Sequence, residues 1–206
     1  MAIAKFEAFL ESLIIGERFK REIYRPCLET IPSSTIAGFF RENLGLMDAM
    51  GVGIFQPGSY ERRWTVGALT DKALQGASLP IETEYLAPVN GLIKASIYLV
   101  WNGPESCLAS VRDMSVVMGA WRYKGFGRGR LSFRKVFDPP IVPVTMKTRL
   151  TAKAAAALGV RRVIAPVFGY LFESTGPLTG HWTRSLFEGS VVEGPEFLGE
   201  RYIYDV

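Results

Sequence analysis

Side chains that commonly bind metal ions are scarce in this sequence. It contains one histidine, His181, and two cysteines, Cys27 and Cys107, which lie far apart and form no C-x-x-C pair. A structural zinc site needs four such ligands at short spacing, so we expect no metal site, and nothing in the sequence indicates a cofactor. Two unpaired thiols are typical of a reducing compartment, which predicts a cytoplasmic protein.

Long apolar runs and the common enzyme signatures are missing too. No stretch of about 18 uncharged apolar residues occurs, so the sequence predicts no membrane span. Lys5, Glu7 and Glu11 interrupt the first apolar segment, which argues against a signal peptide. The Walker phosphate-binding pattern, the G-x-S-x-G elbow and the H-E-x-x-H motif are absent. The sequence therefore favours no enzyme class directly.

The net charge is small. Lysine and arginine number 24 against 20 acidic residues, which gives a formal charge of +4 and a pI of about 9.1. An excess of this size does not by itself indicate a nucleic-acid partner. Apolar residues make up 48% of the chain and charged residues 21%, which is typical of a globular protein. Any argument for a polyanionic partner therefore depends on where the cations lie.

Cations, aromatic residues and glycines alternate from Met118 to Arg130, and no acidic residue occurs from Met114 to Phe137. Glycine lets a backbone approach a ligand closely, arginine and lysine pair with phosphate, and aromatic rings stack on bases. This combination predicts a site for a polyanion with exposed bases, and RNA is the first candidate. A tight turn with merely solvated arginines is the alternative. The candidate residues are Arg122, Lys124, Gly125, Phe126, Gly127, Arg128, Gly129 and Arg130.

The hydrophobic pattern predicts an α+β fold. Strands are expected near 2–15, 52–55, 91–101 and 130–136, and helices near 33–44 and 105–118. This order is βαββαβ, the ferredoxin-like (RRM-like) arrangement, in which two helices cover one face of an antiparallel four-stranded sheet.

Two further segments complete the predicted organisation. Residues 56–90 are rich in glycine, proline and serine and predict a projecting hairpin or loop that carries Arg62, Arg63 and Trp64. Asp138-Pro139-Pro140 marks a boundary between a first domain, 1–137, and a smaller β-rich unit, 138–206. In that unit we expect strands near 142–150, 163–172 and 201–204 and a helix near 152–158.

The predicted first helix has its own candidate site. Ser33 or Ser34 is expected to cap it and Gly45 to end it. Gly38 lies in its second turn, where glycine costs about 1 kcal/mol relative to alanine, so a close neighbour would explain its presence. Free amides and hydroxyls at a helix start also suit a phosphate. The residues alone support a simple cap and a phosphate site equally.

Both motifs resemble those of one family. The run from Ile31 to Arg41 is similar to the first-helix pattern of the RAMP superfamily of CRISPR-associated proteins, roughly I-P-x-S-S/T-I-x-G-x-x-R. The run from Tyr123 to Arg130 resembles the glycine-rich loop of that superfamily, in its usual place before the last strand. The resemblance covers about residues 2–137. One ferredoxin-like domain, a long insertion and a reduced second unit resemble the Cas-five branch and its type III and type IV relatives.

This resemblance implies a non-catalytic subunit of a class 1 CRISPR ribonucleoprotein effector complex in antiviral defence. Such a subunit caps the backbone of the complex and binds the 5′ handle of the guide RNA (crRNA), with 56–90 as a thumb. The implied partners are guide RNA, the backbone and large subunits and, as a further candidate, the target nucleic acid. The resemblance adds these residues to the RNA site: Ser33, Ser34, Thr35, Arg41, Arg62, Arg63 and Trp64.

Other functions stay open. A metal-independent endoribonuclease that processes guide precursors would need a general acid or base, for which His181, Tyr24, Tyr123 and Lys124 are candidates. We expect His181 to be an ordinary structural residue. A Cas-seven-like backbone subunit carries similar motifs, and a purely structural protein would use the glycine loop only to pack against a neighbouring subunit.

Overall fold

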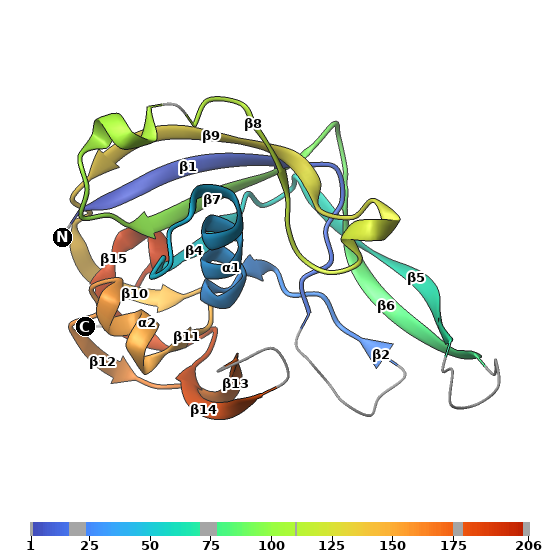
Figure 1. Ribbon diagram of the computed structural model, residues 1–206. Helices are drawn as coiled ribbons and strands as arrows, with labels where there is room; N and C mark the ends of the chain where they lie inside the picture. The colour runs from blue at the N-terminus through green and yellow to red at the C-terminus, as the bar shows by residue number, and fades with distance from the viewer. Residues whose placement is uncertain (1, 17–23, 71–77, 110, 175–178, 204–206) are drawn as a thin grey trace.

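The computed structural model describes residues 2–16, 24–70, 78–109, 111–174 and 179–203, and antiparallel strands dominate it (Figure 1). The strands are β1 (Ile3–Leu10), β2 (Tyr24–Arg25), β3 (Thr30–Ile31), β4 (Gly51–Phe55), β5 (Tyr60–Thr70), β6 (Ser78–Pro88), β7 (Ile93–Val100), β8 (Met114–Val117), β9 (Arg128–Phe137), β10 (Ile141–Met146), β11 (Leu150–Thr151), β12 (Arg162–Ala165), β13 (Phe168–Ser174), β14 (Gly180–Leu186), β15 (Val191–Pro195) and β16 (Gly199–Arg201). The α-helices of the described residues are α1 (Ser33–Leu44) and α2 (Ala152–Ala157), and the 3-10 turns are η2 (Glu105–Leu108), η3 (Arg122–Lys124) and η4 (Glu196–Leu198).

Six strands form a central antiparallel sheet in the order β3-β4-β7-β1-β9-β8. Side chains of a strand alternate between its two faces. In β1 the even positions, such as Phe6 and Leu10, are fully buried beneath α1, while Lys5, Glu7 and Phe9 are partly exposed. We call the face that carries Lys5, Glu7 and Phe9 the outer face of the sheet.

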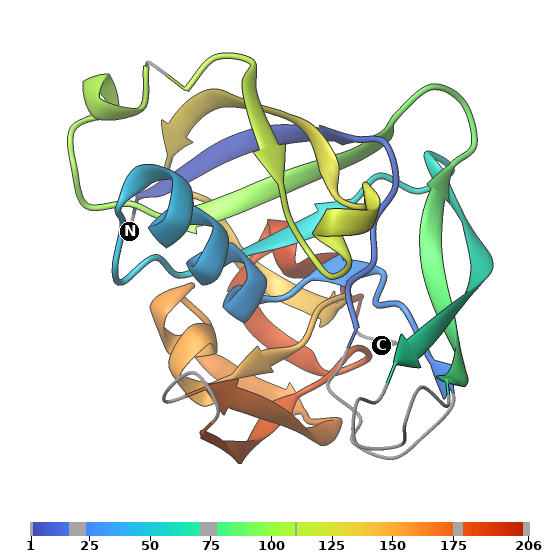
Figure 2. The same cartoon turned by 45° about the vertical axis from the view of Figure 1, so that its right-hand side comes forward.

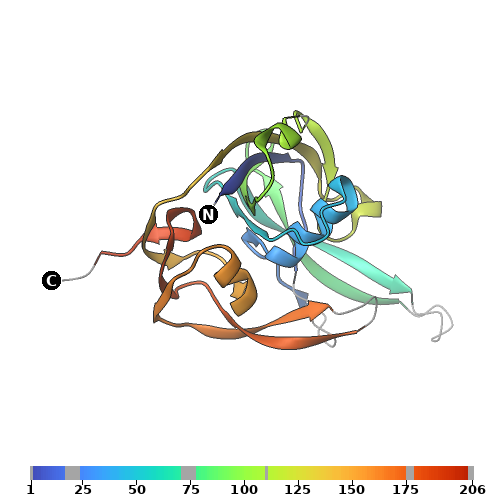
Figure 3. The same ribbon diagram turned by 60° about the vertical axis from the view of Figure 1, so that its left-hand side comes forward.

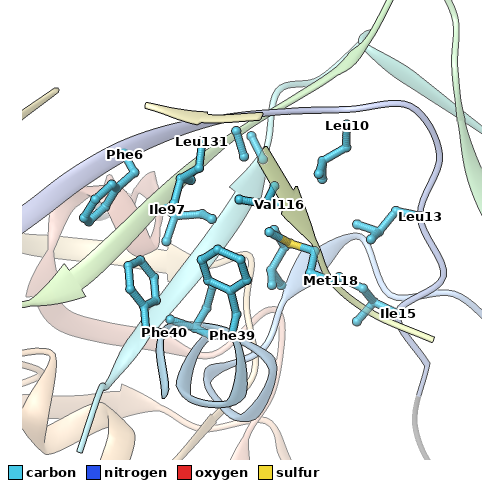
Figure 4. Close-up of a cluster of buried hydrophobic side chains, with 14 of the residues drawn as sticks. Phe6, Leu10, Leu13, Ile15, Phe39, Phe40, Ile97, Val116, Met118 and Leu131 are labelled. Atoms are coloured by element: carbon cyan, nitrogen blue, oxygen red, sulfur yellow. The ribbon is translucent and has the colours of Figure 1, made fainter. Parts of the chain in front are cut away.

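The main core lies between this sheet and α1, as Figure 4 shows. Phe40 of α1 packs against Phe6 of β1 and against Phe39, with ring centroids 5.2 and 5.1 Å apart. Burying aromatic rings of this size stabilises the fold by roughly 2 kcal/mol each relative to exposure. Helical spacing places Ile36, Phe39 and Phe40 on the face of α1 that packs on the sheet.

The two ends of α1 agree differently with the predicted caps. Gly45 ends the helix in the left-handed conformation with φ 68°, which confirms its predicted role. The predicted serine cap is wrong, because Pro32 is the N-cap residue and neither Ser33 nor Ser34 caps with its side chain. The Pro32 carbonyl instead accepts hydrogen bonds from the amides of Thr35 and Ile36 at 3.0 and 3.1 Å.

The second predicted helix is wrong. The 3-10 turn η2 occupies its start, and its second half is β8, which pairs with the start of β9. Asp113 interrupts the segment with φ 50°, and its carboxylate accepts a hydrogen bond from the Ser132 hydroxyl at 2.9 Å. Val116 and Val117 follow, and β-branched residues favour a strand. The fold is α+β and mostly antiparallel, and the βαββαβ order is not complete in the described residues.

The segment between β4 and β7 forms a long hairpin that extends away from the central sheet (Figures 1 and 2). Its strands β5 and β6 pair from Tyr60 opposite Pro88 to Thr70 opposite Ser78. Its base is tied to the segment after β1, because Leu13 and Leu86 exchange backbone hydrogen bonds of 3.0 and 2.8 Å.

The chain after β9 builds two smaller sheets, β12-β15-β10-β16 and β11-β14-β13, together with α2. The Thr151 hydroxyl caps α2 by accepting the Ala154 amide at 3.3 Å. A second core joins Ile3 and Val52 of the central sheet to residues such as Val144. This C-terminal part therefore covers one end of the outer face, on the side of the sheet away from α1 (Figure 3). No helix in the described ranges has the length and apolar character to cross a membrane.

Candidate nucleic-acid interface

The glycine-rich segment folds into a tight turn fixed to the chain that follows β1. We call residues 118–127 the glycine turn. The Met118 amide donates to the Gly127 carbonyl at 3.0 Å and closes the turn. The Gly127 amide donates to the Ser12 carbonyl at 2.7 Å, and the Ala120 amide to the Ile14 carbonyl at 2.8 Å. Backbone hydrogen bonds near the start and at the end of the turn thus fix it to residues 12–14.

The glycines of this segment serve the protein's own packing. A Cβ at Gly127, where φ is 77°, would overlap the Met118 carbonyl, and a Cβ at Gly129 would overlap the Phe9 carbonyl. Gly125 has open space around it but adopts φ 93°, and its amide donates within the turn. The amides of Gly125 and Gly127 are therefore already hydrogen-bonded within the chain.

The aromatic residues of the turn differ in accessibility. Phe126 is half-buried between Tyr85 of β6 and Trp121, with ring centroids 5.3 and 6.3 Å away. It therefore joins the turn to the β5–β6 hairpin. Tyr123 is 82% exposed and presents an open ring at the tip of the turn. Trp121 takes the left-handed conformation at φ 52°, which is strained for a non-glycine residue.

The four cations predicted to bind RNA in this segment differ in their interaction partners. Arg122 forms an ion pair of 2.9 Å with Glu42 of α1, and the Lys124 ammonium lies 4.3 Å from the centroid of the Trp121 ring. The side chains of Arg128 and Arg130 are exposed on the outer face, and no carboxylate of the described residues pairs with either. These two arginines are available to an anionic ligand without breaking an ion pair described here.

Arg62, at the base of the hairpin, forms ion pairs with two carboxylates. It lies 2.6 Å from Glu29 and 3.5 Å from Glu84, and Glu84 is 3% exposed. The side-chain hydrogen bond to Glu29 raises the pKa of Arg62. Glu84 also accepts the Cys27 amide at 2.7 Å, and burial raises the pKa of the Cys27 thiol to about 11. Arg62 therefore fixes the base of the hairpin.

The next two residues of β5 point to opposite faces of the hairpin. Arg63 is exposed and hydrogen-bonds Glu61 at 2.7 Å, which raises the pKa of Arg63. Trp64 lies opposite Glu84 and is 55% exposed, so its ring is largely accessible from solvent.

The candidate residues of α1 are spread along the helix. Ser33, Ser34 and Thr35 form its first turn, while the exposed Arg41 lies in its last turn, about 10 Å further along the axis. Within the described residues Arg41 pairs with no carboxylate. The ion pair from Arg122 to Glu42 joins the glycine turn to the last turn of α1. The structure thus brings the glycine turn toward Arg41.

His181 lies on the β13–β14 hairpin, apart from the glycine turn in Figures 1 and 2. Its Nε2 is 3.6 Å from Glu173, whose carboxylate also accepts the Thr183 hydroxyl at 3.1 Å. Tyr24, another candidate acid or base, lies in strand β2, and its side chain is outside the described part of the structure. Among the described residues, no three His, Cys, Asp or Glu side chains gather closely enough to hold a metal ion.

Two residues in the same row as Arg130 were not predicted from the sequence. Phe9 lies directly opposite Arg130 on β1, and Lys94 lies opposite Phe9 on β7. The alternation of buried and exposed residues along β1 and β7 could have indicated which face Phe9 and Lys94 lie on. Their place in one row with Arg130 depends on strand order and register, which cannot be read from the sequence.

Solved structures share this fold across nearly the whole chain. The match covers 94% of this chain and 86% of a chain in a cryo-EM structure of type III-B Cmr-beta bound to cognate target RNA and AMPPnP, with a TM-score of 0.60 and 11% sequence identity. A second structure, of type III-B Cmr-beta bound to cognate target RNA, matches over the same shares with a TM-score of 0.54 and 10% identity. No protein-family model matches the sequence, and no curated protein matches it. The similarity established by these comparisons is one of fold.

Proposed function

We propose that this protein is a non-catalytic, RNA-binding subunit of a class 1 CRISPR ribonucleoprotein effector complex. The observation that carries the proposal is the fold that this protein shares, over 94% of its length, with a chain in a structure of type III-B Cmr-beta bound to cognate target RNA and AMPPnP. Two sequence motifs that resemble those of RAMP proteins occur in the same chain, in the expected order. The motifs and the fold agree, which supports the proposal.

The proposed RNA site is the glycine turn together with the start of β9. Arg128 and Arg130 neutralise phosphates, because no described carboxylate competes for them. Lys124 adds a third cation, and the exposed ring of Tyr123 stacks on a base. Phe126 acts indirectly by fixing the turn against Tyr85. In this arrangement the side chains, and not the amides of the glycine turn, contact the RNA.

The finer role follows the RAMP resemblance. The protein binds the 5′ handle of a guide RNA and caps the backbone of the complex, next to backbone and large subunits. Residues 1–137 form the RNA-binding domain, and 138–206 form the smaller unit. The β5–β6 hairpin is the thumb, on which Trp64 and Arg63 contact RNA near the handle. Ser33 to Thr35 and Arg41 line the guide along α1.

Salt-dependent binding tests this function. Each phosphate neutralised on a single strand adds about 0.7 to the slope of log affinity against log salt. The double variant Arg128→Gln, Arg130→Gln should therefore reduce the slope for single-stranded RNA by about 1.4. Arg161→Gln is the matched control, because Arg161 is also exposed and pairs with no described carboxylate. An equal slope for both proteins would remove Arg128 and Arg130 from the site.

A further inference from the structure

A row of complementary side chains crosses the outer face beyond the glycine turn. Strand register places Lys94 of β7 opposite Phe9 of β1, and Phe9 opposite Arg130 of β9. Directly opposite residues on one face lie about 5 Å apart, so Phe9 is a neighbour of both Lys94 and Arg130. Lys94 and Arg130 are exposed and Phe9 is partly exposed. A flat ring therefore lies between two cations.

This row borders an open groove. The groove has a volume of about 490 Å³, and its lining includes Phe9, Ile54, Lys94 and Ser96. Tyr98 and Phe197 also line it, stacked on each other with ring centroids 4.1 Å apart and an interplanar angle of 8°. The C-terminal part thus contributes an aromatic wall and leaves the Lys94–Arg130 end of the outer face uncovered.

The strands of the outer face carry more cations than acids, although Glu11, one residue beyond β1, lies opposite Arg128. Glu7 is the single acidic residue in strands β1, β7, β8 and β9, and it is bound by Arg134 at 2.9 Å. The cations that these strands carry are Lys5, Lys94, Arg128, Arg130, Arg134 and Lys135. A surface with this excess attracts a polyanion and repels a basic partner.

We propose that single-stranded RNA crosses this outer face, with Phe9 stacking on a base and Lys94 and Arg130 binding the flanking phosphates. The inference rests on the proposed function and extends its RNA site from β9 to β1 and β7. Single-stranded RNA is recognised through splayed bases that stack on aromatic rings, and a sheet with aromatic residues on its middle strands is a suitable platform. A double helix presents no open base to Phe9.

Binding of a fluorescein-labelled oligouridylate to the full chain, followed by anisotropy, tests the proposal. Phe9→Leu keeps an apolar side chain and removes the flat ring, and it should weaken binding about fivefold or more. Lys94→Gln should lower the salt slope by about 0.7. Lys153→Gln, on the exposed side of α2, is the matched control and should leave the slope unchanged.

A ribose-phosphate oligomer without bases separates stacking from charge. It should bind wild-type protein and Phe9→Leu equally, while Lys94→Gln still lowers its salt slope. If Phe9→Leu and Lys94→Gln bind oligouridylate like wild type while the Arg128, Arg130 double variant does not, the outer-face path is overturned and the proposed function stands. If wild type binds no single-stranded RNA, both proposals fail.

Discussion

Arg122 of the glycine turn donates a hydrogen bond to Glu42 of α1 across 2.9 Å, although 80 positions separate them in the chain. Both side chains are about half exposed, so the pair contributes at most about 1 kcal/mol to stability. Its larger effect is to hold a cation away from other anions.

Releasing this arginine should strengthen RNA binding. Glu42→Gln removes the competing carboxylate, and we expect the salt slope for single-stranded RNA to rise by up to about 0.7. The free energy of unfolding should change by less than about 1 kcal/mol. Adding Arg122→Gln should cancel the gain in binding. A gain that persists in the double variant would show that Arg122 is not its source.

Gly127 should tolerate no side chain. Gly127→Ala places a methyl group on the Met118 carbonyl in a backbone conformation that disfavours L-residues, so we expect a loss of about 2 kcal/mol or more in unfolding free energy. Gly58→Ala is the control, since it has a similar φ of 77° and open space around it. Denaturant unfolding measures both. Equal losses would mean that backbone conformation alone, without the overlap, explains the effect.

Gly38 should behave in the opposite way. No atom lies within 4 Å of a Cβ at this helical position, so Gly38→Ala should stabilise the fold by up to about 1 kcal/mol. If guide RNA approaches α1 there, the same substitution should weaken RNA binding. Unfolding and anisotropy experiments on one sample separate the effects. Greater stability with unchanged binding would place the RNA away from the helix.

Cys27 should make stability depend on alkaline pH. Burial raises its pKa from 9.0 to about 11, so between these values the unfolded thiol loses its proton while the folded thiol keeps it. Unfolding is thereby favoured, and stability should fall by about 2 kcal/mol as pH rises through this window. Cys27→Ala should lose this component. An identical pH dependence in both proteins would mean that other groups cause the fall.

We expect the protein not to cleave RNA, and we expect His181 to have no catalytic role. It pairs with Glu173 on an exposed hairpin, apart from the glycine turn. Incubated with single-stranded repeat RNA and a chelator, the purified chain should leave the RNA intact. Cleavage at one position that disappears in His181→Ala, or in Tyr123→Phe, would instead support the endoribonuclease alternative.

Local patterns predicted much of the fold. Helical spacing of Ile36, Phe39 and Phe40 and the terminal Gly45 gave the correct extent of α1, because both features act within a few residues. The prediction of a second helix was wrong because tertiary contacts decide the structure of that segment. Its later half pairs with β9, and an apolar run of that length fits a helix or a strand equally well.

The candidate site was harder to predict than the fold. Charge and aromatic content singled out the glycine turn as a candidate RNA site, which stays a prediction. They did not reveal that Arg62 is paired with Glu29 and Glu84, or that Phe126 packs against Tyr85, since those partners come from distant parts of the chain. Whether an arginine or an aromatic ring is accessible depends on which distant residues the fold places beside it, and this cannot be read from local sequence.

The buried carboxylate of Glu84 joins the base of the long hairpin to Cys27 and to Arg62. Strand β5 spans 11 residues, so its far end lies about 35 Å from the base. A rotation of about 5° at the base would displace that end by about 3 Å, the length of a hydrogen bond. The direction in which the hairpin points toward any distant neighbour therefore depends on a small set of contacts at its base, among them those of Glu84 with Cys27 and Arg62.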